Sequence, residues 1–478
     1  MKDLRTSSTH LLCVGLAVLA AVVAVRLAPA VLGDDAAITL RYAERLAQGR
    51  GFSYNDHERV LGTSSPLYTL LLALSAWLGA SVEGAARAFG TLFFAATVGL
   101  AAGLGARLGG RLAALAVGAC LLAELFFRVQ MLCGLEVGLS LALGLLAILL
   151  LAEGRDRAAG LVLGLAVWNK LDAGLLAIAA ACACTIARRR FPFGVAAHAL
   201  LVVGPWLLFA TLYFGSPVPR SVTVKLHEGT GIGMDHGWIL DFLFDAHRYL
   251  LVLAAGALAV VSARLDPGAR IATLALFTWL VLHGAAASVV NLGAPYPWYL
   301  TALIPPLVIL ASAFAARALA ASPWSWWWRP PTAIAWIGLG LFVLTTGRAT
   351  LPELLRGPAL KPWEAFDGDR RAAGEFLRRH ADPREVVECV YGWVAFASKL
   401  PVVDAINTRR SPGPTRYRVE HGRPYARGSH APLGPEGYIP IARFDEASRR
   451  FPGYSWFVVF ADPSSRLARA AERAGEIK

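Results

Sequence analysis

Long apolar runs separated by short charged segments constrain this chain more than any other feature of its sequence. A helix needs about 20 predominantly apolar residues to cross the roughly 30 Å hydrocarbon core of a bilayer, and such runs recur from residue 11 to residue 346. Of the 478 residues, 56% are hydrophobic and 17% are charged, and the mean hydropathy is +0.52. Soluble domains carry about 25% charged residues, so a soluble globular enzyme is excluded. We expect a polytopic α-helical membrane protein.

The runs predict about eleven transmembrane helices. Two shorter runs, 158–169 and 173–187, flank the polar residues Lys170 and Asp172 and are expected to meet there at a polar apex. The longer runs are 11–32, 85–107, 112–127, 135–152, 193–214, 246–262, 271–290, 299–319 and 331–346.

One further run, 66–79, is short for a span, and charge decides where it lies. If it crossed the membrane, Arg107 and Arg111 would lie outside, and every later Arg cluster would be inverted. If it lies in the outer interface, these clusters fall in the cytoplasm, as the positive-inside rule requires. We therefore expect a cytoplasmic N-terminus, an extracytoplasmic C-terminus, and a first outer loop over 33–84 that carries an interfacial helix.

The remaining charge pattern supports this topology. The net charge is +13, from 46 basic and 33 acidic residues, and many Arg residues stand in short runs between apolar segments. This is the distribution of cytoplasmic loops in membrane proteins, so nucleic acid is not an expected partner. The six cysteines form no disulfide framework and no metal-ligand spacing. The lipid bilayer is the expected environment of residues 1–346.

Two adjacent carboxylates, Asp34 and Asp35, stand directly after the first span, and Arg41 follows them. Adjacent carboxylates repel, so one pKa can rise while the other residue stays ionised, or the two can hold a divalent cation. The alternative is that these acidic residues only end a helix where it meets water. Both interpretations stay open from the residues alone.

Ionisable residues also occur at the outer ends of later spans. Glu136 lies near one such end, and Lys170 and Asp172 lie at the apex between the two short helices. Charged groups at membrane depth are costly and usually face a cavity or one another. They are therefore candidates for substrate binding, and a purely structural Lys170–Asp172 pair is the alternative.

Two more outer segments complete the candidate site. The loop after Phe214 contains Lys225 and His227, and Tyr299 belongs to an aromatic segment at the start of a later span. A solvated loop and an ordinary aromatic belt are the alternatives. Together, these cations, carboxylates and rings suit transfer of a group from a lipid-phosphate donor: cations would bind the phosphate, and a carboxylate would deprotonate the acceptor hydroxyl.

Three segments of the first outer loop form one motif: 34–43 (DDAAITLRYA), 49–55 (GRGFSYN) and 62–68 (GTSSPLY). This motif resembles bacterial polytopic glycosyltransferases of the GT-C class, most closely the branch that includes the mycobacterial terminal arabinofuranosyltransferases. Weaker similarities extend the resemblance over most of the chain, at 134–136, 164–174, 217–225 and 402–404.

The resemblance implies a GT-C-like transmembrane catalytic domain over 1–346 in a bacterial inner (cell) membrane, with the active site open to the extracytoplasmic side. It implies a polyprenyl-phosphate sugar as donor, with arabinofuranose as the sugar, and a cell-envelope glycan or glycoconjugate hydroxyl as acceptor. Asp34 or Asp35 would be the general base. Arg41, Lys170 and Lys225 would bind the donor phosphate, and Glu136 would shape the pocket. Asp172, His227 and Tyr299 are further substrate-binding candidates by their position on the outer side alone.

The expected reaction is an inverting displacement at the anomeric carbon, and metal dependence varies within the class. Related chains often have Arg-Pro-Glu or Arg-Pro-Asp where this one has Lys170-Leu171-Asp172, and Asn in place of Arg220. These differences leave the donor open. The competing hypotheses are a transporter or flippase for a lipid-linked sugar, although no internal repeat of the kind common in transporters is evident, and a non-catalytic envelope assembly protein.

The tail, 347–478, is polar and rich in Pro and Arg, and we expect a small extracytoplasmic α/β domain. Its patterns predict helices over 369–381 and 466–474, strands over 386–391, 400–403 and 456–460, and a loop over 407–438. The domain would either cap the outer active site or hold the acceptor glycan.

Overall fold

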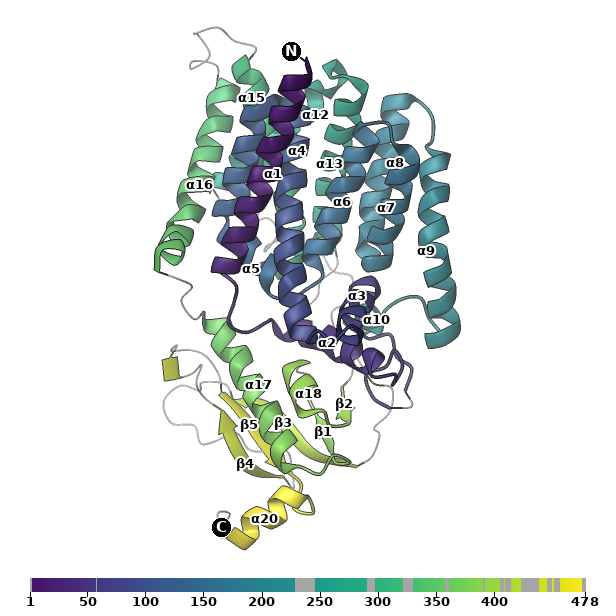
Figure 1. Cartoon of the computed structure of the whole chain (residues 1–478), viewed down its shortest axis with the longest axis vertical. Helices are drawn as coiled ribbons and strands as arrows, with labels where there is room; N and C mark the ends of the chain where they lie inside the picture. The colour runs from purple at the N-terminus through teal and green to yellow at the C-terminus, as the bar shows by residue number, and fades with distance from the viewer. Residues whose placement is uncertain are drawn as a thin grey trace.

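The computed structural model combines a bundle of long helices with a small mixed α/β domain at one end of the bundle (Figure 1). The N-terminus lies at the opposite end of the bundle from this domain. The structure describes residues 2–56, 58–227, 246–289, 297–320, 330–356, 361–389, 392–404, 408, 414–422, 438–444, 449–450 and 456–474.

Each apolar run expected from the sequence falls on a helix of the bundle. Six described helices are long and apolar enough to cross a membrane, or up to seven if the bent pair α5–α6 is one span. The bundle helices are α1 (Lys2–Arg26), α4 (Val82–Ala123), α5 (Leu125–Leu132), α6 (Val137–Ala152), α7 (Asp156–Asn169), α8 (Gly174–Arg188), α9 (Phe193–Phe214), α12 (Ala246–Val260), α13 (Pro267–Val289), α14 (Pro297–Thr301), α15 (Ile304–Ala320) and α16 (Pro330–Arg356), with short 3₁₀ turns η1 (Leu171–Ala173) and η2 (Val261–Arg264).

Two boundaries differ from the expected runs for physical reasons. The first run continues to residue 32, but α1 ends at Arg26, because Pro29 disfavours helical geometry in the residue before it. The 42-residue α4 contains two of the expected spans, joined at Gly110, where φ is 77°. Glycine adopts this left-handed conformation without steric cost. Arg111 donates to the hydroxyl of Thr9, so the break lies at the N-terminal end of the bundle.

Small residues allow helices α7 and α9 to pack closely. A Cβ added to Gly160 or Gly164 of α7 would lie 2.5 Å from a backbone carbonyl oxygen of α9. Glycines four residues apart let two helix backbones approach closely within a membrane. This contact fixes the position of α7, whose last residue precedes Lys170.

The first outer loop forms two helices at the end of the bundle nearest the C-terminal domain (Figure 1). They are α2 (Asp34–Ala47) and α3 (Pro66–Trp77). The short apolar helix expected at 66–79 is therefore present, and Pro66 stands at its start, where a missing N–H costs nothing. The short helix α10 (Arg220–His227) lies at the same end.

The C-terminal domain is a five-stranded mixed sheet of order β2-β1-β3-β5-β4 with helices packed against it. Strand β1 pairs in parallel with β2 and β3, and β5 pairs antiparallel with β3 and β4. Its elements are α17 (Pro362–His380), β1 (Val386–Glu388), α18 (Gly392–Ser398), β2 (Val402–Val403), β3 (Thr415–Gly422), β4 (Ile439–Phe444), β5 (Trp456–Ala461) and α20 (Arg466–Ala474).

One expectation for the tail is wrong. The loop expected over 407–438 contains β3, in which Tyr417 and Val419 are buried while Arg416, Arg418 and Glu420 are less so. The surrounding Arg, Pro and Gly residues hid this alternation. Helix α16 continues to Arg356, ten residues past the end of the last expected span.

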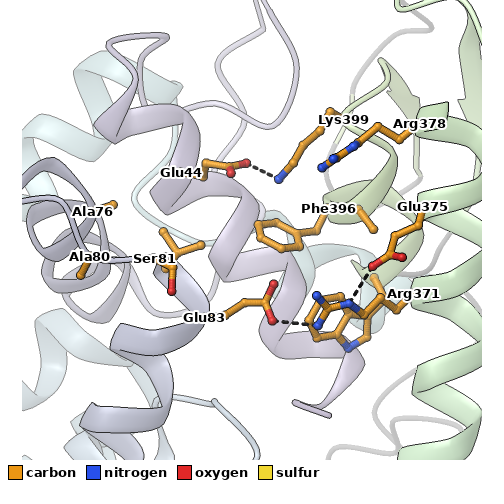
Figure 2. A pocket seen from close by; sticks show the side chains of 13 residues that line it. Glu44, Ala76, Ala80, Ser81, Glu83, Arg371, Glu375, Arg378, Phe396 and Lys399 are labelled. Carbon is orange, nitrogen blue, oxygen red and sulfur yellow. Dashed lines mark hydrogen bonds and ion pairs between the residues drawn. The ribbon is translucent and has the colours of Figure 1, made fainter. Parts of the chain in front are cut away.

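The domain contacts the first outer loop through backbone and side-chain bonds. Trp393 is fully buried, and its Nε1–H donates to the Leu32 carbonyl (2.8 Å). Asn55 pairs like a strand residue with Val402, donating to its carbonyl (2.7 Å) and accepting its N–H (3.0 Å). Ion pairs Glu44–Lys399 and Glu83–Arg371 join the same two parts (Figure 2).

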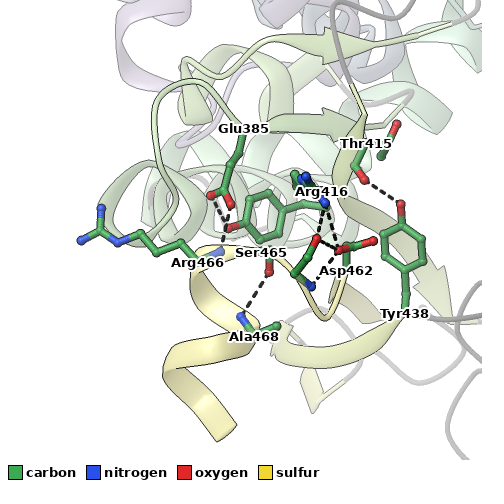
Figure 3. A network of polar contacts seen from close by, with 10 residues as sticks. Glu385, Thr415, Arg416, Tyr438, Asp462, Ser465, Arg466 and Ala468 are labelled. Carbon is green, nitrogen blue, oxygen red and sulfur yellow. Dashed lines mark hydrogen bonds and ion pairs between the residues drawn. The ribbon is translucent and has the colours of Figure 1, made fainter. Parts of the chain in front are cut away.

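A second polar network attaches α20 to the sheet (Figure 3). Glu385 accepts from the Tyr417 hydroxyl (2.6 Å) and from the Arg466 N–H (2.9 Å). The Ser465 hydroxyl accepts from the Ala468 N–H (3.2 Å), which satisfies a donor in the first turn of α20. This network lies far from the bundle (Figure 1), and its role is to hold α20 against the sheet.

Candidate functional site

Asp34 and Asp35 occupy the first turn of α2 but face different surroundings. Consecutive helical residues point about 100° apart, so one helix can present them to two sites. The Asp34 carboxylate accepts the N–H of Gly392 (3.1 Å) and of Trp393 (2.9 Å), at the start of α18. A Cβ on Gly392 would lie 2.2 Å from the Asp34 carbonyl oxygen, so the approach requires glycine. In the structure, Asp34 attaches α2 to the C-terminal domain.

A second carboxylate and one arginine complete this junction. The Asp34 N–H donates to Asp367 Oδ2 (3.1 Å), and Arg370 Nη1 lies 2.7 Å from Asp367 Oδ1 and 3.6 Å from Asp34 Oδ2. Burial, together with the nearby Asp34 charge, raises the pKa of Asp367 to about 7. Two carboxylates therefore share one guanidinium between the two domains.

These contacts decide whether Asp34 could hold the divalent cation that the sequence suggested for the Asp34–Asp35 pair. Both Asp34 oxygens already accept backbone N–H groups, and Arg370 stands beside them. Within the described parts of the chain, no group of three or more His, Cys, Asp or Glu side chains is arranged to hold a metal ion. The donor set around Asp34 does not fit a cation.

Arg41 lies on the same face of α2 as Asp34, seven residues later, and is buried in the same junction. Its guanidinium donates to the carbonyls of Tyr54 (2.9 Å), Ala395 and Leu400 (2.8 Å), and to Asn55 Oδ1 (3.3 Å). It also lies 4.7 Å from the centroid of the Tyr54 ring. The structure thus places Arg41 in the domain junction, and each of these hydrogen bonds goes to a residue outside the candidate set.

Glu136, Lys170, Asp172 and Tyr299 do come together, at the end of the bundle near α2. Lys170 Nζ lies 2.9 Å from Glu136 Oε1, 3.9 Å from Asp172 Oδ2 and 5.3 Å from the centroid of the Tyr299 ring. The side chains of Glu136 and Lys170 are 6% and 11% exposed, and that of Asp172 is 31% exposed. The ammonium is therefore buried between a buried carboxylate and a more accessible one.

Local backbone geometry produces this convergence. Helices α5 and α6 meet at 108°, and Gly134 in the break has φ 90°, which aims Glu136 inward at the start of α6. Lys170 has extended geometry between α7 and η1, so the chain turns there and Asp172 returns beside Lys170. The polar apex expected from the sequence is present, but its main ion pair reaches a different helix.

A chain of buried hydroxyl groups links Glu136 to α2. Ser65 lies within interaction range of the Glu136 carboxylate, and Thr63 Oγ1 lies 3.4 Å from Ser65 Oγ and 3.3 Å from Thr39 Oγ1. Thr39 follows Asp35 by four residues, so both lie on one face of α2. Asp35 also lies within electrostatic range of Tyr299. Asp35 therefore lies on the face of α2 that carries Thr39 and the hydroxyl chain, whereas Asp34 lies on the face that contacts α18.

Sequence reasoning missed several members of this cluster. His283 of α13 is buried, donates through Nε2 to the Tyr299 carbonyl (3.0 Å) and interacts electrostatically with Asp172. Asn169 donates to Ser140 Oγ (2.7 Å), and its Oδ1 is buried without a hydrogen-bond partner. A lone His inside a span was the available signal. The side chains of the candidates Lys225 and His227, at the end of α10, lie outside the described residues.

Comparisons with known proteins bear on the fold. ArnT from Cupriavidus metallidurans bound to undecaprenyl phosphate matches with TM-score 0.60 and 15% identity, covering 94% of this chain and 97% of its own. ArnT from the same organism in the apo state matches with TM-score 0.61 and 13% identity, covering 97% and 99%. No protein-family model and no curated protein matches the sequence. The likeness confirms the expected GT-C-like polytopic membrane fold with a small C-terminal sheet, and it does not extend to the arabinofuranosyltransferase branch.

Proposed function

We propose that this protein is a polyprenyl-phosphate-sugar-dependent glycosyltransferase of the inner membrane. The observation that carries the proposal is the buried Lys170 ammonium beside Glu136, Asp172 and Tyr299, at the end of the bundle near α2, which carries Asp35. A neighbour of the same fold was solved with undecaprenyl phosphate, which has the chemistry of the product that such a donor would release. The acceptor would be a cell-envelope glycan or glycoconjugate hydroxyl.

In the proposed reaction, Asp35 is the general base. Its carboxylate takes the proton of the acceptor hydroxyl as that oxygen attacks the anomeric carbon from the face opposite the phosphate. The bond from the anomeric carbon to the phosphate oxygen breaks, its electron pair leaves with the polyprenyl phosphate, and the configuration inverts. Lys170 stabilises the charge that develops on the leaving phosphate. The proton ends on Asp35, and the phosphate gains one negative charge.

Lys170 is already paired, so donor binding has to compete for it. Asp172 is the weaker partner, at 3.9 Å, and the more exposed one. We expect the phosphate to displace Asp172 while Glu136, at 2.9 Å, continues to hold Lys170. His283 then remains near the displaced carboxylate. Glu136 and its hydroxyl chain act as positioning groups for Lys170.

The finer assignments follow from the sequence motifs. Arabinofuranose is the sugar that the first-loop motif favours, and the Arg-rich loops favour a cytoplasmic N-terminus with the site and the C-terminal domain outside. Residues 1–346 would then form the transmembrane catalytic part and 347–478 the extracytoplasmic part. Lys225 and His227 remain proposed as additional cations for the donor.

The test is sugar transfer from radiolabelled polyprenyl-phosphate sugars to endogenous acceptors in membranes that contain wild-type or Asp35→Asn protein. A matched control is Asp156→Asn, because Asp156 pairs with Arg188 at the end of α7 opposite Lys170. We expect one donor to label the acceptor with wild type and control, and Asp35→Asn to reduce labelling by about 10²–10⁴-fold at equal expression. Equal labelling by all three proteins would refute the assignment, as would movement of the lipid-linked sugar across the membrane without transfer.

A further inference from the structure

A separate pocket lies between the first outer loop and the C-terminal domain (Figure 2). Its volume is about 300 Å³. The charged side chains that line it are Glu44, Glu83, Arg371, Glu375, Arg378 and Lys399. The remaining lining is partly aromatic, with Phe396 and Trp393 of α18.

The pocket is distinct from the cluster around Lys170. Glu44 follows Asp35 by nine residues on α2, and nine steps of 100° place the two side chains on opposite faces of the helix. A helix with its side chains is about 10 Å across. Nine residues also rise about 13.5 Å along the axis, so Glu44 lies roughly 17 Å from the proposed base on the same helix.

Two of its cations are held rigidly. Arg371 lies 2.8 Å from Glu83 Oε2 and 3.1 Å from Glu375 Oε1, and its Cζ lies 5.0 Å from the centroid of the Trp393 ring. Lys399 pairs with Glu44, and its Nζ lies 3.7 Å from the centroid of the Phe396 ring. Preorganised charges of this kind bind a ligand with little loss of side-chain entropy.

The backbone at Lys399 is strained. Its φ is 60°, a left-handed conformation that only one other non-glycine residue, Arg189, adopts in the described chain. A residue with a Cβ pays about 1 kcal/mol or more for this conformation, and glycine is usual at the position after a helix end. The Lys399 side chain is thus present where glycine would stabilise the backbone, and strain of this kind concentrates at functional sites.

Arg378 supplies a cation that remains available. It lies seven residues after Arg371 on α17, on the same face, and it is exposed. Figure 2 draws it beside Lys399 and without a polar contact to the other residues of the pocket. No carboxylate in the described chain lies within ion-pair distance of its guanidinium. A planar guanidinium that has no acidic partner within ion-pair distance favours a carboxylate or phosphate from a ligand.

We propose that this pocket binds an acidic sugar unit of the acceptor glycan, remote from the hydroxyl that is glycosylated. Arg378 would bind the acidic group, and the carboxylates Glu44 and Glu375 would accept hydrogen bonds from the sugar hydroxyls beside the Phe396 ring. Such remote contacts supply binding energy that positions the reacting group. The proposal rests on the proposed function for its role in catalysis, but binding itself can be measured without turnover.

The experiment is saturation-transfer NMR on the detergent-solubilised full-length protein, with trigalacturonate as the acidic probe and maltotriose as the neutral probe. Wild type is compared with Arg378→Glu and with Arg384→Glu, a matched charge reversal at an exposed residue that does not line the pocket. We expect trigalacturonate to bind wild type and Arg384→Glu alike and maltotriose to bind less. Arg378→Glu should weaken trigalacturonate binding about tenfold.

Lys399→Gly is a second variant, because it removes an ammonium from the pocket while relieving the backbone strain. It should weaken binding in a protein that stays folded. Absence of trigalacturonate binding to wild type, or equal losses with Arg378→Glu and Arg384→Glu, would overturn the proposal. Binding of undecaprenyl phosphate should be unchanged in Arg378→Glu. A failure of the glycosyltransferase assignment is therefore separable, because it would appear with Asp35→Asn and leave oligosaccharide binding intact.

Discussion

The adjacent residues Asp34 and Asp35 allow the sharpest test of the site, because the structure gives them different neighbours. Asp34→Asn keeps one carbonyl oxygen as acceptor for α18 but loses the charge and turns an NH₂ group toward the second N–H. Hydrogen bonds to a charged group contribute about 1.5–3 kcal/mol, against about 1 kcal/mol for neutral ones. Relief of the repulsion between Asp34 and Asp367 offsets part of the loss. We expect a net cost of about 2 kcal/mol to docking of α18.

This cost is about 30-fold in the docking equilibrium, since 1.4 kcal/mol is tenfold. Hydrogen-exchange mass spectrometry of α18 measures it directly, because the N–H groups of Gly392 and Trp393 are the donors concerned. Exchange should accelerate about 30-fold in Asp34→Asn and stay unchanged in Asp35→Asn. Turnover should fall by 10²–10⁴-fold in Asp35→Asn and less than about tenfold in Asp34→Asn. The reverse pattern, with slow exchange in Asp34→Asn and full turnover in Asp35→Asn, would refute the division of roles.

Three further predictions follow from the same contacts. Lys170→Ala should weaken binding of undecaprenyl phosphate at least about tenfold, as measured by calorimetry, whereas Lys170→Arg should retain part of it. Trp393→Phe removes the buried bond to the Leu32 carbonyl and should destabilise docking by about 1–3 kcal/mol, which is visible as faster exchange in α18. Because the pKa of Asp367 is raised on folding, its contribution to docking is complete below about pH 4 and is lost as the pH rises toward 7. Exchange in α18 should therefore be slower at pH 5 than at pH 8, after correction for intrinsic rates.

Each of these results has a contrary outcome. Unchanged affinity in Lys170→Ala would mean that Lys170 only closes the polar apex with its two carboxylates. Unchanged exchange in Trp393→Phe would mean that apolar packing alone holds α18. A protection profile for α18 that does not change with pH, or a pH dependence that survives in Asp367→Asn, would remove Asp367 as the titrating group.

The bundle was predictable because its signal is local. An apolar run of sufficient length can bury its backbone only as a helix. The Arg residues between runs predict on which side of the membrane each connecting loop lies. The same comparison of Arg clusters predicted that the short apolar helix α3 lies in the interface and does not cross the membrane. The sheet was less predictable, since β3 pairs with strands far away in the chain and its flanks resemble a loop.

The site was only half predictable. The sequence places Lys170 beside Asp172, and the structure keeps them 3.9 Å apart. The closer partner, Glu136, lies on another helix, and nothing between residues 136 and 170 signals that the bend at Gly134 brings them together. The hydroxyl chain through Thr63 and Ser65 lies within the first-loop motif, but only the fold joins it to Glu136.

Asp34 and Arg41 illustrate why residue type alone misassigns roles. A carboxylate and a guanidinium on one face of a helix suit cation and phosphate chemistry equally well. Their partners are the N–H groups of Gly392 and Trp393 and the carbonyl of Leu400, which are backbone atoms that every residue carries. Sequence patterns cannot identify such partners. Both residues nevertheless serve the site, because they hold one face of α2 against α18 and thereby set the direction in which Asp35 points on the next face. If Asp35 is the base, the C-terminal domain positions it, and any variant that loosens α18 should lower turnover without touching Asp35.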